Sequence, residues 1–122
     1  MEGSTFAERL ARLTVICKNK YGAQLDKPYA EEAKLLNEVK WLLDMCFPYV
    51  WYNREDAKTI SGVPDILACI QGHFVAFELK DNIGKASAPQ LAKIDCIIRS
   101  GGIAIVTRTI SEVLAVLSAC SE

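Results

Sequence analysis

The chain has 122 residues and a mass of 13.5 kDa, enough for one domain built around one hydrophobic core. Its composition, 51% hydrophobic and 24% charged, is that of a globular protein, and no apolar stretch approaches the ~20 residues that cross a bilayer. The net charge of -1 argues mildly against a nucleic-acid-binding protein, because phosphate contacts require Lys and Arg, although a local basic surface can override the overall balance.

The first part of the chain predicts two helices. Thr5 and Glu8 have the spacing of a capping box, so the first helix is expected to begin at Thr5 or one residue earlier. A second helix is expected over about residues 29–46, and Pro48 ends it. The apolar stripe of this second helix consists of Leu35, Leu36, Val39, Leu42, Leu43 and Cys46.

The middle of the chain predicts three strands. Residues 49–52 are rich in strand-forming side chains, and Tyr49 and Trp51 share one face that is expected to lie in the core. Two apolar runs follow, at residues 65–70 and 74–80, separated by a short glycine-containing turn. They predict a hairpin in which both strands are largely buried.

The last part of the chain predicts a helix, a strand and a helix. The helix is expected over about residues 88–100, the strand over 103–106, and Ser111 is expected to cap the final helix. The inward residues of the first of these helices are expected to be Leu91, Ile94, Ile97 and Ile98. This order of elements predicts an α/β fold with one mixed sheet covered by helices on both faces.

The predicted hairpin brings three charged side chains together. Glu78 and Lys80 are two residues apart on one strand, so they point to the same side, and Asp65 stands at the start of the other strand after Pro64. Two carboxylates at one point can share a Mg²⁺ ion, and Lys80 can orient or deprotonate a water or stabilise charge in the transition state. This is the chemistry of phosphodiester hydrolysis.

Glu32 is a third candidate carboxylate. At about 100° per residue it lies roughly 20° from Val39 and 40° from Leu36, within the apolar stripe of its helix. A carboxylate that faces the core is costly unless a metal ion or Lys80 compensates it. The alternative is that Glu32 belongs to a hydrated first turn, where the helix dipole favours an acid.

Two other classes of site are not expected. Five cysteines without a CxxC pair do not predict a zinc site or a disulfide framework, and buried reduced thiols in a cytosolic protein are the simpler interpretation. Gly84-Lys85-Ala86-Ser87 is not a phosphate-binding loop, because the first glycine of that motif would fall at Leu79. No nucleotide cofactor is therefore expected.

The motifs in combination resemble a known family. Gly62, Pro64 and Asp65, then Glu78 and Lys80, are similar to the motif of the PD-(D/E)xK nuclease superfamily. Together with Gly84-Lys85-x-Ser87-x-x-Gln90 and Gly101-Gly102, they resemble the virus-type replication-repair nuclease family, VRR-Nuc, whose small stand-alone members occur in phages.

The resemblance covers roughly residues 30–108 and implies a restriction-endonuclease-like core of α-β-β-β-α-β order, with an extra N-terminal helix and a C-terminal helix. Residues 1–122 would form a single nuclease domain, in which residues 1–28 are the N-terminal helix and loop, 29–108 the core and 109–122 the C-terminal helix. The implied location is the cytoplasm, or the host cytoplasm if the protein is phage-encoded.

The resemblance also implies roles for single residues. Asp65 and Glu78 would bind Mg²⁺, with Mn²⁺ able to substitute, and Lys80 would be the catalytic lysine. Glu32 would be the helix carboxylate, a role that Glu31 or Glu38 could take instead, and the glutamine near the cleaved phosphate would be Gln90. The implied activity is metal-dependent hydrolysis of branched or structured DNA, in which a homodimer could address two strands.

Further residues are candidates for DNA contact. Asn53, Arg54 and Lys58 precede the motif and could touch phosphate, although a solvated loop is an equally good interpretation. Lys85 is expected near DNA, and Ser87 is expected to cap the helix that carries Gln90. Two further hypotheses stay open: a non-catalytic DNA-binding or assembly module with this fold and, among the enzymes, a junction resolvase.

Overall fold

The computed structural model of the protein describes residues 4–55 and 61–122. The elements, in chain order, are α1 (Phe6–Tyr21), the 3₁₀ helix η1 (Gly22–Asp26), α2 (Glu32–Met45), β1 (Val50–Arg54), β2 (Ile66–Ile70), β3 (His73–Leu79), α3 (Ala88–Arg99), β4 (Ile103–Thr107) and α4 (Ile110–Cys120). The order expected from the sequence is confirmed, with η1 added between the first two helices. Within the described residues, no helix is both long enough and apolar enough to span a lipid bilayer.

The four strands form one sheet in the order β1-β2-β3-β4. β1 pairs with β2, and β2 with β3, in antiparallel fashion, whereas β3 and β4 are parallel and α3 connects them. The mixed sheet with helices on both faces is therefore as predicted.

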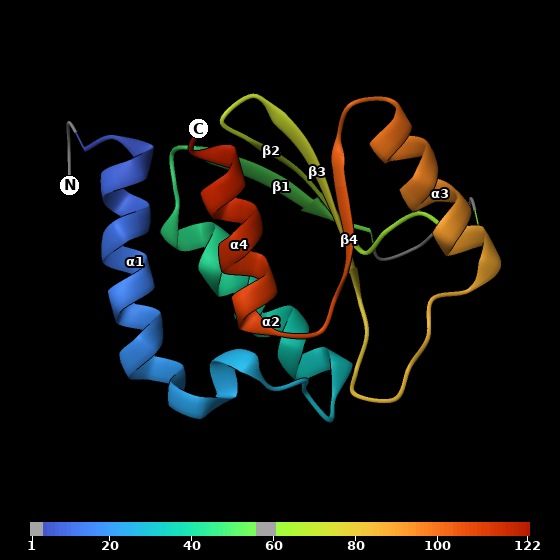
Figure 1. Cartoon of the computed structure of the whole chain (residues 1–122), viewed down its shortest axis with the longest axis horizontal. Coiled ribbons are helices and arrows are strands. Elements are labelled where there is room, and N and C mark those ends of the chain that lie inside the picture. The colour runs from blue at the N-terminus through green and yellow to red at the C-terminus, as the bar shows by residue number, and fades with distance from the viewer. Residues whose placement is uncertain (1–3, 56–60) are drawn as a thin grey trace.

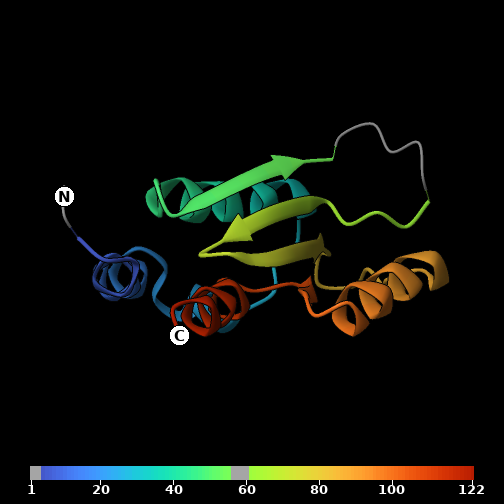
Figure 2. The same cartoon turned by 90° about the horizontal axis from the view of Figure 1, so that it is seen from above.

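Alternate residues of β3 contact helices on opposite faces of the sheet. Val75, Phe77 and Leu79 belong to the main core, which the apolar sides of α1, α2 and α4 complete. Ala76 points the other way and packs with Ile94 of α3 in a smaller cluster. Figures 1 and 2 show α4 and α3 on opposite sides of β4. We call the α3 side of the sheet the outer face.

Three helices begin with a reciprocal capping box, in which a hydroxyl and a carboxylate or amide satisfy the free backbone N–H groups. Thr5 caps α1 as predicted, and Ser87 caps α3 as predicted. The cap of α4 is Thr109 and not Ser111, because Glu112 completes the box three residues after Thr109. α2 starts at Glu32, three residues later than expected.

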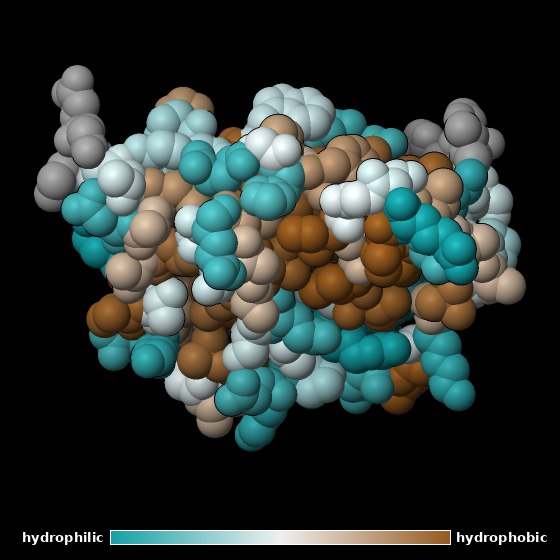
Figure 3. Space-filling model, turned by 45° about the horizontal axis from the view of Figure 1, so that its top comes forward, coloured by the Kyte–Doolittle hydropathy of each residue, from teal (hydrophilic) through white to brown (hydrophobic). Residues whose placement is uncertain are grey.

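Several residues that were expected inside are exposed. Trp51 is 65% exposed, and Leu91 and Ile98 are each 52% exposed. β1 is an edge strand and α3 packs mainly over β3 and β4, so apolar residues on the outer face beside them stay open. Figure 3 shows apolar surface gathered between α4 and α3, along β4.

The cysteines also include both buried and exposed residues. Cys17, Cys46 and Cys120 are buried, whereas Cys69 and Cys96 are exposed, so the expectation of buried thiols is correct for only part of the set. All five are free thiols. Burial raises the pKa of Cys46 to about 11, which makes that thiol unreactive.

Candidate metal centre

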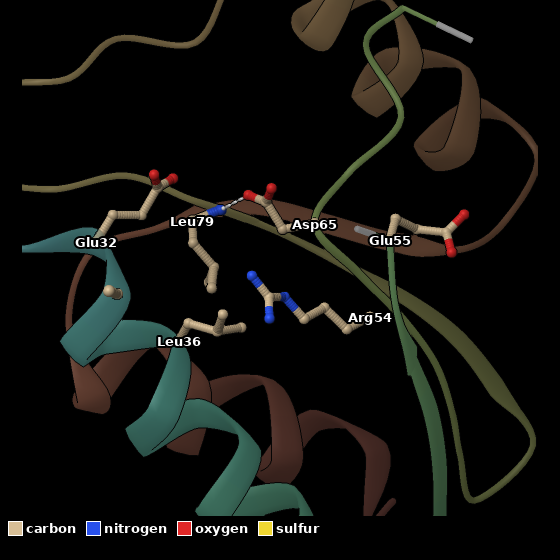
Figure 4. Close-up of a pocket in the computed structure, with 7 residues that line it drawn as sticks. Glu32, Leu36, Arg54, Glu55, Asp65 and Leu79 are labelled. Atoms are coloured by element: carbon tan, nitrogen blue, oxygen red, sulfur yellow. Dashed lines mark hydrogen bonds between the residues drawn. The ribbon is translucent and has the colours of Figure 1, made fainter. Parts of the chain in front are cut away.

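A pocket of about 260 Å³ lies at one end of the sheet, where α2 begins, β1 ends, β2 begins and β3 ends (Figure 4). The residues that line it are Glu32, Ala33, Leu36, Arg54, Glu55, Asp65 and Leu79. Because four elements meet there, side chains far apart in the sequence converge at this end of the sheet.

Three carboxylates converge at this pocket. Glu32, Asp65 and Glu78 each place one oxygen within 4.8 Å of the others. Glu32 is exposed, Asp65 is half-buried and Glu78 is buried, so the cluster reaches from solvent into the protein. Like charges at such short range repel strongly, and a cation between them would relieve the repulsion.

Asp65 is positioned by the hairpin that the sequence predicts. Ile66 pairs with Phe77, so one step further along the same register Asp65 faces Glu78. Asp65 also holds the end of β3 directly, because its Oδ2 accepts a hydrogen bond from the backbone N–H of Leu79 at 2.7 Å (Figure 4). Its own carbonyl accepts from the N–H of Glu55 at 2.8 Å, which ties the site to the end of β1.

Glu78 is only 1% exposed and has two polar neighbours that compensate its burial. Lys80 Nζ lies 3.7 Å from Glu78 Oε2, and Gln90 Nε2 donates a hydrogen bond to the same oxygen at 3.2 Å. Gln90 also completes the capping box of α3, since its Oε1 accepts from the N–H of Ser87 at 2.8 Å. The start of α3 is thereby fixed to the buried carboxylate.

The structure distinguishes the three glutamates of the second helix. Glu31 pairs with Lys34 at 3.7 Å on the surface. Glu38 accepts a hydrogen bond from the Tyr21 hydroxyl at 2.7 Å, and burial together with this bond raises the pKa of Tyr21. Glu32 is the one that joins the carboxylate cluster.

The expectation that Glu32 faces the core is wrong. Glu32 is the first residue of α2 and is exposed, as the alternative of a hydrated first turn describes. Its carboxylate nevertheless reaches Asp65 and Glu78, because the first turn of α2 lies beside the end of the sheet where these two residues stand (Figure 4).

The donor set fits a hard divalent cation. Mg²⁺ takes oxygen ligands at about 2.0–2.1 Å, so oxygens around one ion lie up to about 4 Å apart, close to the spacing of these carboxylates. Thiols and imidazoles, which zinc prefers, do not belong to the cluster. Glu32, Asp65 and Glu78 are thus the residues that would hold Mg²⁺ or Mn²⁺.

The structure gives the positions of most residues that were expected to contact DNA. Arg54 reaches into the pocket from β1, on the side of Leu36 (Figure 4). Asn53 Nδ2 donates to Glu55 Oε2 at 2.8 Å beside the pocket. Lys85 is exposed on the loop before α3, Ser87 is the helix cap as expected, and Lys58 lies outside the described residues.

Sequence reasoning identified neither Glu55 as part of the site nor the close packing at Gly62, although Gly62 belongs to the motif. Glu55 lines the pocket, but nothing in its polar surroundings in the sequence distinguishes it. Gly62 has a φ of +87°, and a Cβ there would stand 2.4 Å from the carbonyl oxygen of Pro89. The loop before Asp65 therefore passes against the start of α3 at a distance that only glycine permits.

No protein-family model matches the sequence, and no curated protein matches it. Among solved structures, the chain is similar to one described as a "VRR_NUC domain", with a TM-score of 0.60 and 19% sequence identity. The similarity covers 71% of this chain and 94% of that chain. The protein has the VRR_NUC fold. The resemblance read from the motifs is confirmed at the level of the fold.

Proposed function

We propose that this protein is a Mg²⁺-dependent DNA endonuclease that hydrolyses phosphodiester bonds, with branched or structured DNA as its substrate. The observation that carries the proposal is the convergence of Glu32, Asp65 and Glu78 within 4.8 Å, with Lys80 3.7 Å from the buried carboxylate. Three acids and one amine at the end of a VRR_NUC fold supply what metal-dependent phosphodiester hydrolysis requires.

A divalent cation at this site would supply Lewis-acid chemistry: it neutralises charge on the phosphate and makes water more acidic. The residues of the chain perform the rest. Hydrogen bonds from the N–H of Leu79 and the amide of Gln90 position Asp65 and Glu78, so both carboxylates are partly preorganised for a cation. Lys80 places its ammonium where it can orient the attacking water or offset charge that develops on the phosphate.

The proposal includes contacts with DNA around the site. Arg54 enters the same pocket as the carboxylates, and Lys85 stands exposed on the loop that follows Lys80. Both can contact phosphate groups on either side of the cleaved bond. With a net charge of -1, the chain depends on such local groups for binding, so binding should weaken as salt is raised.

The proposal also includes a homodimer. One site cleaves one strand, so two copies would be needed to cut both strands of a duplex together. Val15 and Ile16 expose apolar surface on α1, which a second copy could cover. Light scattering on the purified chain measures this directly: a mass near twice 13.5 kDa supports the homodimer, and a mass of 13.5 kDa at micromolar concentration contradicts it.

The test of the enzymatic proposal is cleavage of linear and branched DNA with Mg²⁺, Mn²⁺ or EDTA. We expect cutting with either metal and none with EDTA. Asp65→Asn and Lys80→Ala should each abolish it, whereas Asp95→Asn, which removes an exposed acid paired with Arg99 on α3, should not. Cutting that survives both site substitutions would contradict the proposal. Metal-independent DNA binding without cutting would support the non-catalytic module instead.

Substrate geometry provides a second test. Symmetric paired nicks on four-way junctions would identify a junction resolvase, and a preference for branched over linear DNA would support the proposed substrate class. Equal cutting of all substrates would contradict that class while leaving the nuclease itself intact.

A further inference from the structure

The loop between β3 and α3 carries an unusual apolar side chain. Ile83 is 81% exposed, more than any other large apolar side chain in the described part of the chain. It stands three residues after Lys80 and two before Lys85, so charged groups surround it in sequence. A single exposed apolar residue is common on proteins, and its exposure alone indicates nothing.

This loop is held firmly, which distinguishes it from an ordinary solvated loop. The Asp81 carboxylate accepts hydrogen bonds from the N–H groups of Ile83 at 3.1 Å and Gly84 at 2.7 Å. Arg108 Nη1 donates to the carbonyl of Asp81 at 2.6 Å. The N–H of Asn82 donates to the carbonyl of Tyr29 at 2.8 Å, just before α2. The backbone before Ile83 is therefore fixed to other parts of the chain, and the N–H groups of Ile83 and Gly84 are fixed to Asp81 within the loop.

The loop also lies against the candidate metal centre. A Cβ placed on Gly84 would stand 3.4 Å from Cδ of Lys80, so the loop folds back onto the lysine side chain. Lys80 in turn lies 3.7 Å from Glu78. Figure 1 shows the segment between β3 and α3 extending beyond the sheet near the start of α2, whose first residue is Glu32.

We propose that Ile83 inserts between neighbouring bases of the bound DNA, next to the phosphate that is cleaved. This inference rests on the proposed nuclease function and assigns it a residue that distorts the substrate. An apolar side chain on a fixed loop loses little conformational freedom on insertion. Isoleucine is among the side chains that proteins use as wedges between base steps. Because it stands alone among charged groups, Ile83 suits insertion into a base stack better than docking on an apolar protein surface.

The insertion has an energetic consequence for the choice of substrate. Unstacking a base step opposes binding, and it opposes binding least where the stack is already interrupted. Ile83 would thus favour cleavage beside a break in the stack. Lys85, two residues further along, is placed to contact a phosphate beside the unstacked step.

The test uses DNA that carries the fluorescent base 2-aminopurine, which brightens when it unstacks. Probes are placed at successive steps around the cleavage position, and binding is measured with Ca²⁺ in place of Mg²⁺ so that the DNA stays intact. We expect the wild-type protein to brighten one or two adjacent probes. Ile83→Ala should lose most of that rise and bind roughly tenfold more weakly, because the isoleucine is no longer buried among bases.

A matched control is Ile98→Ala, which shortens an apolar side chain on α3 that is 52% exposed. It should behave as the wild type in binding and fluorescence. Ile83→Ala that brightens the probes as the wild type does would overturn the inference, as would wild-type protein that cleaves DNA without brightening any probe. If wild-type protein neither binds nor cleaves DNA, the proposed function fails and this inference fails with it.

Discussion

The two ends of the sheet present different chemistry on the same outer face. At one end, Asp65 and Glu78 face each other and meet Glu32. At the other end, Trp51 pairs with Cys69, and Cys69 with Phe74, in a row of exposed and mostly apolar side chains. The first end is tied together by polar side-chain contacts, whereas the second end is open surface.

This difference explains why the sequence predicts the structure of one end of the sheet better than that of the other. Asp65 and Glu78 at the first end have fixed positions on a hairpin, so their convergence follows from the strand period and the register. An apolar residue on a strand indicates that one face is suited to burial but not that anything covers it. Trp51 was therefore expected in the core, although the helices leave its face open.

The largest expected effect is a loss of DNA cleavage when a carboxylate is removed from the end of the sheet that carries Asp65 and Glu78. We expect Glu32→Gln to reduce cleavage on the order of a hundredfold or more, because it removes a negative ligand and leaves the shape unchanged. The free energy of unfolding should change little, since Glu32 is exposed. Single-turnover cleavage and urea unfolding measure the two quantities.

The matched controls for this substitution lie on the same helix. Glu31→Gln loses a surface ion pair with Lys34, and Glu38→Gln alters the bond with Tyr21, but neither touches the cluster. Both should retain cleavage within about threefold of wild type, as expected for surface pairs of small energy. Loss of cleavage in Glu31→Gln or Glu38→Gln, with Glu32→Gln unaffected, would transfer the role to that residue.

The next largest effect is on the free energy of unfolding. It compares Phe77, on the face of the sheet that the main core covers, with Trp51, at the apolar end. Phe77 is fully buried on β3, and Phe77→Ala should lower the free energy of unfolding by about 3–5 kcal/mol. Trp51→Ala should lower it by about 1 kcal/mol or less, because Trp51 is 65% exposed. Chemical denaturation of both variants checks this. A large loss in Trp51→Ala would mean that the open end is covered in solution, by a second copy or another partner.

The smallest expected effect is a difference in stability between the alanine variants of two glycines at opposite ends of β2. Gly62 and Gly72 both have positive φ, +87° and +82°, so alanine at either position costs about 1–2 kcal/mol. Gly72 has open space around it, whereas a Cβ on Gly62 would stand 2.4 Å from the Pro89 carbonyl oxygen. Gly62→Ala should thus lose more stability than Gly72→Ala, and it alone should reduce cleavage by displacing Asp65. Equal losses of stability in both variants would contradict the close approach at Gly62.

Much of the fold and part of the site could be predicted from the sequence. The capping box at Thr5, the helix cap at Ser87 and the hairpin around residues 71–73 could be predicted because these signals are local. The pairing of Asp65 with Glu78 followed from the hairpin register. The position of Glu32 could not be derived, because the packing of α2 against the end of the sheet decides it. The same holds for Gly62, whose neighbour Pro89 lies far along the chain.

We propose that Glu32, Asp65 and Glu78 together bind one divalent cation. Anomalous diffraction from a crystal soaked in Mn²⁺ tests it most directly. We expect a manganese peak at about 2.0–2.3 Å from oxygens of these carboxylates, and no such peak in Asp65→Asn. A soaked crystal with no peak beside the three carboxylates, or with manganese bound only elsewhere, would contradict it.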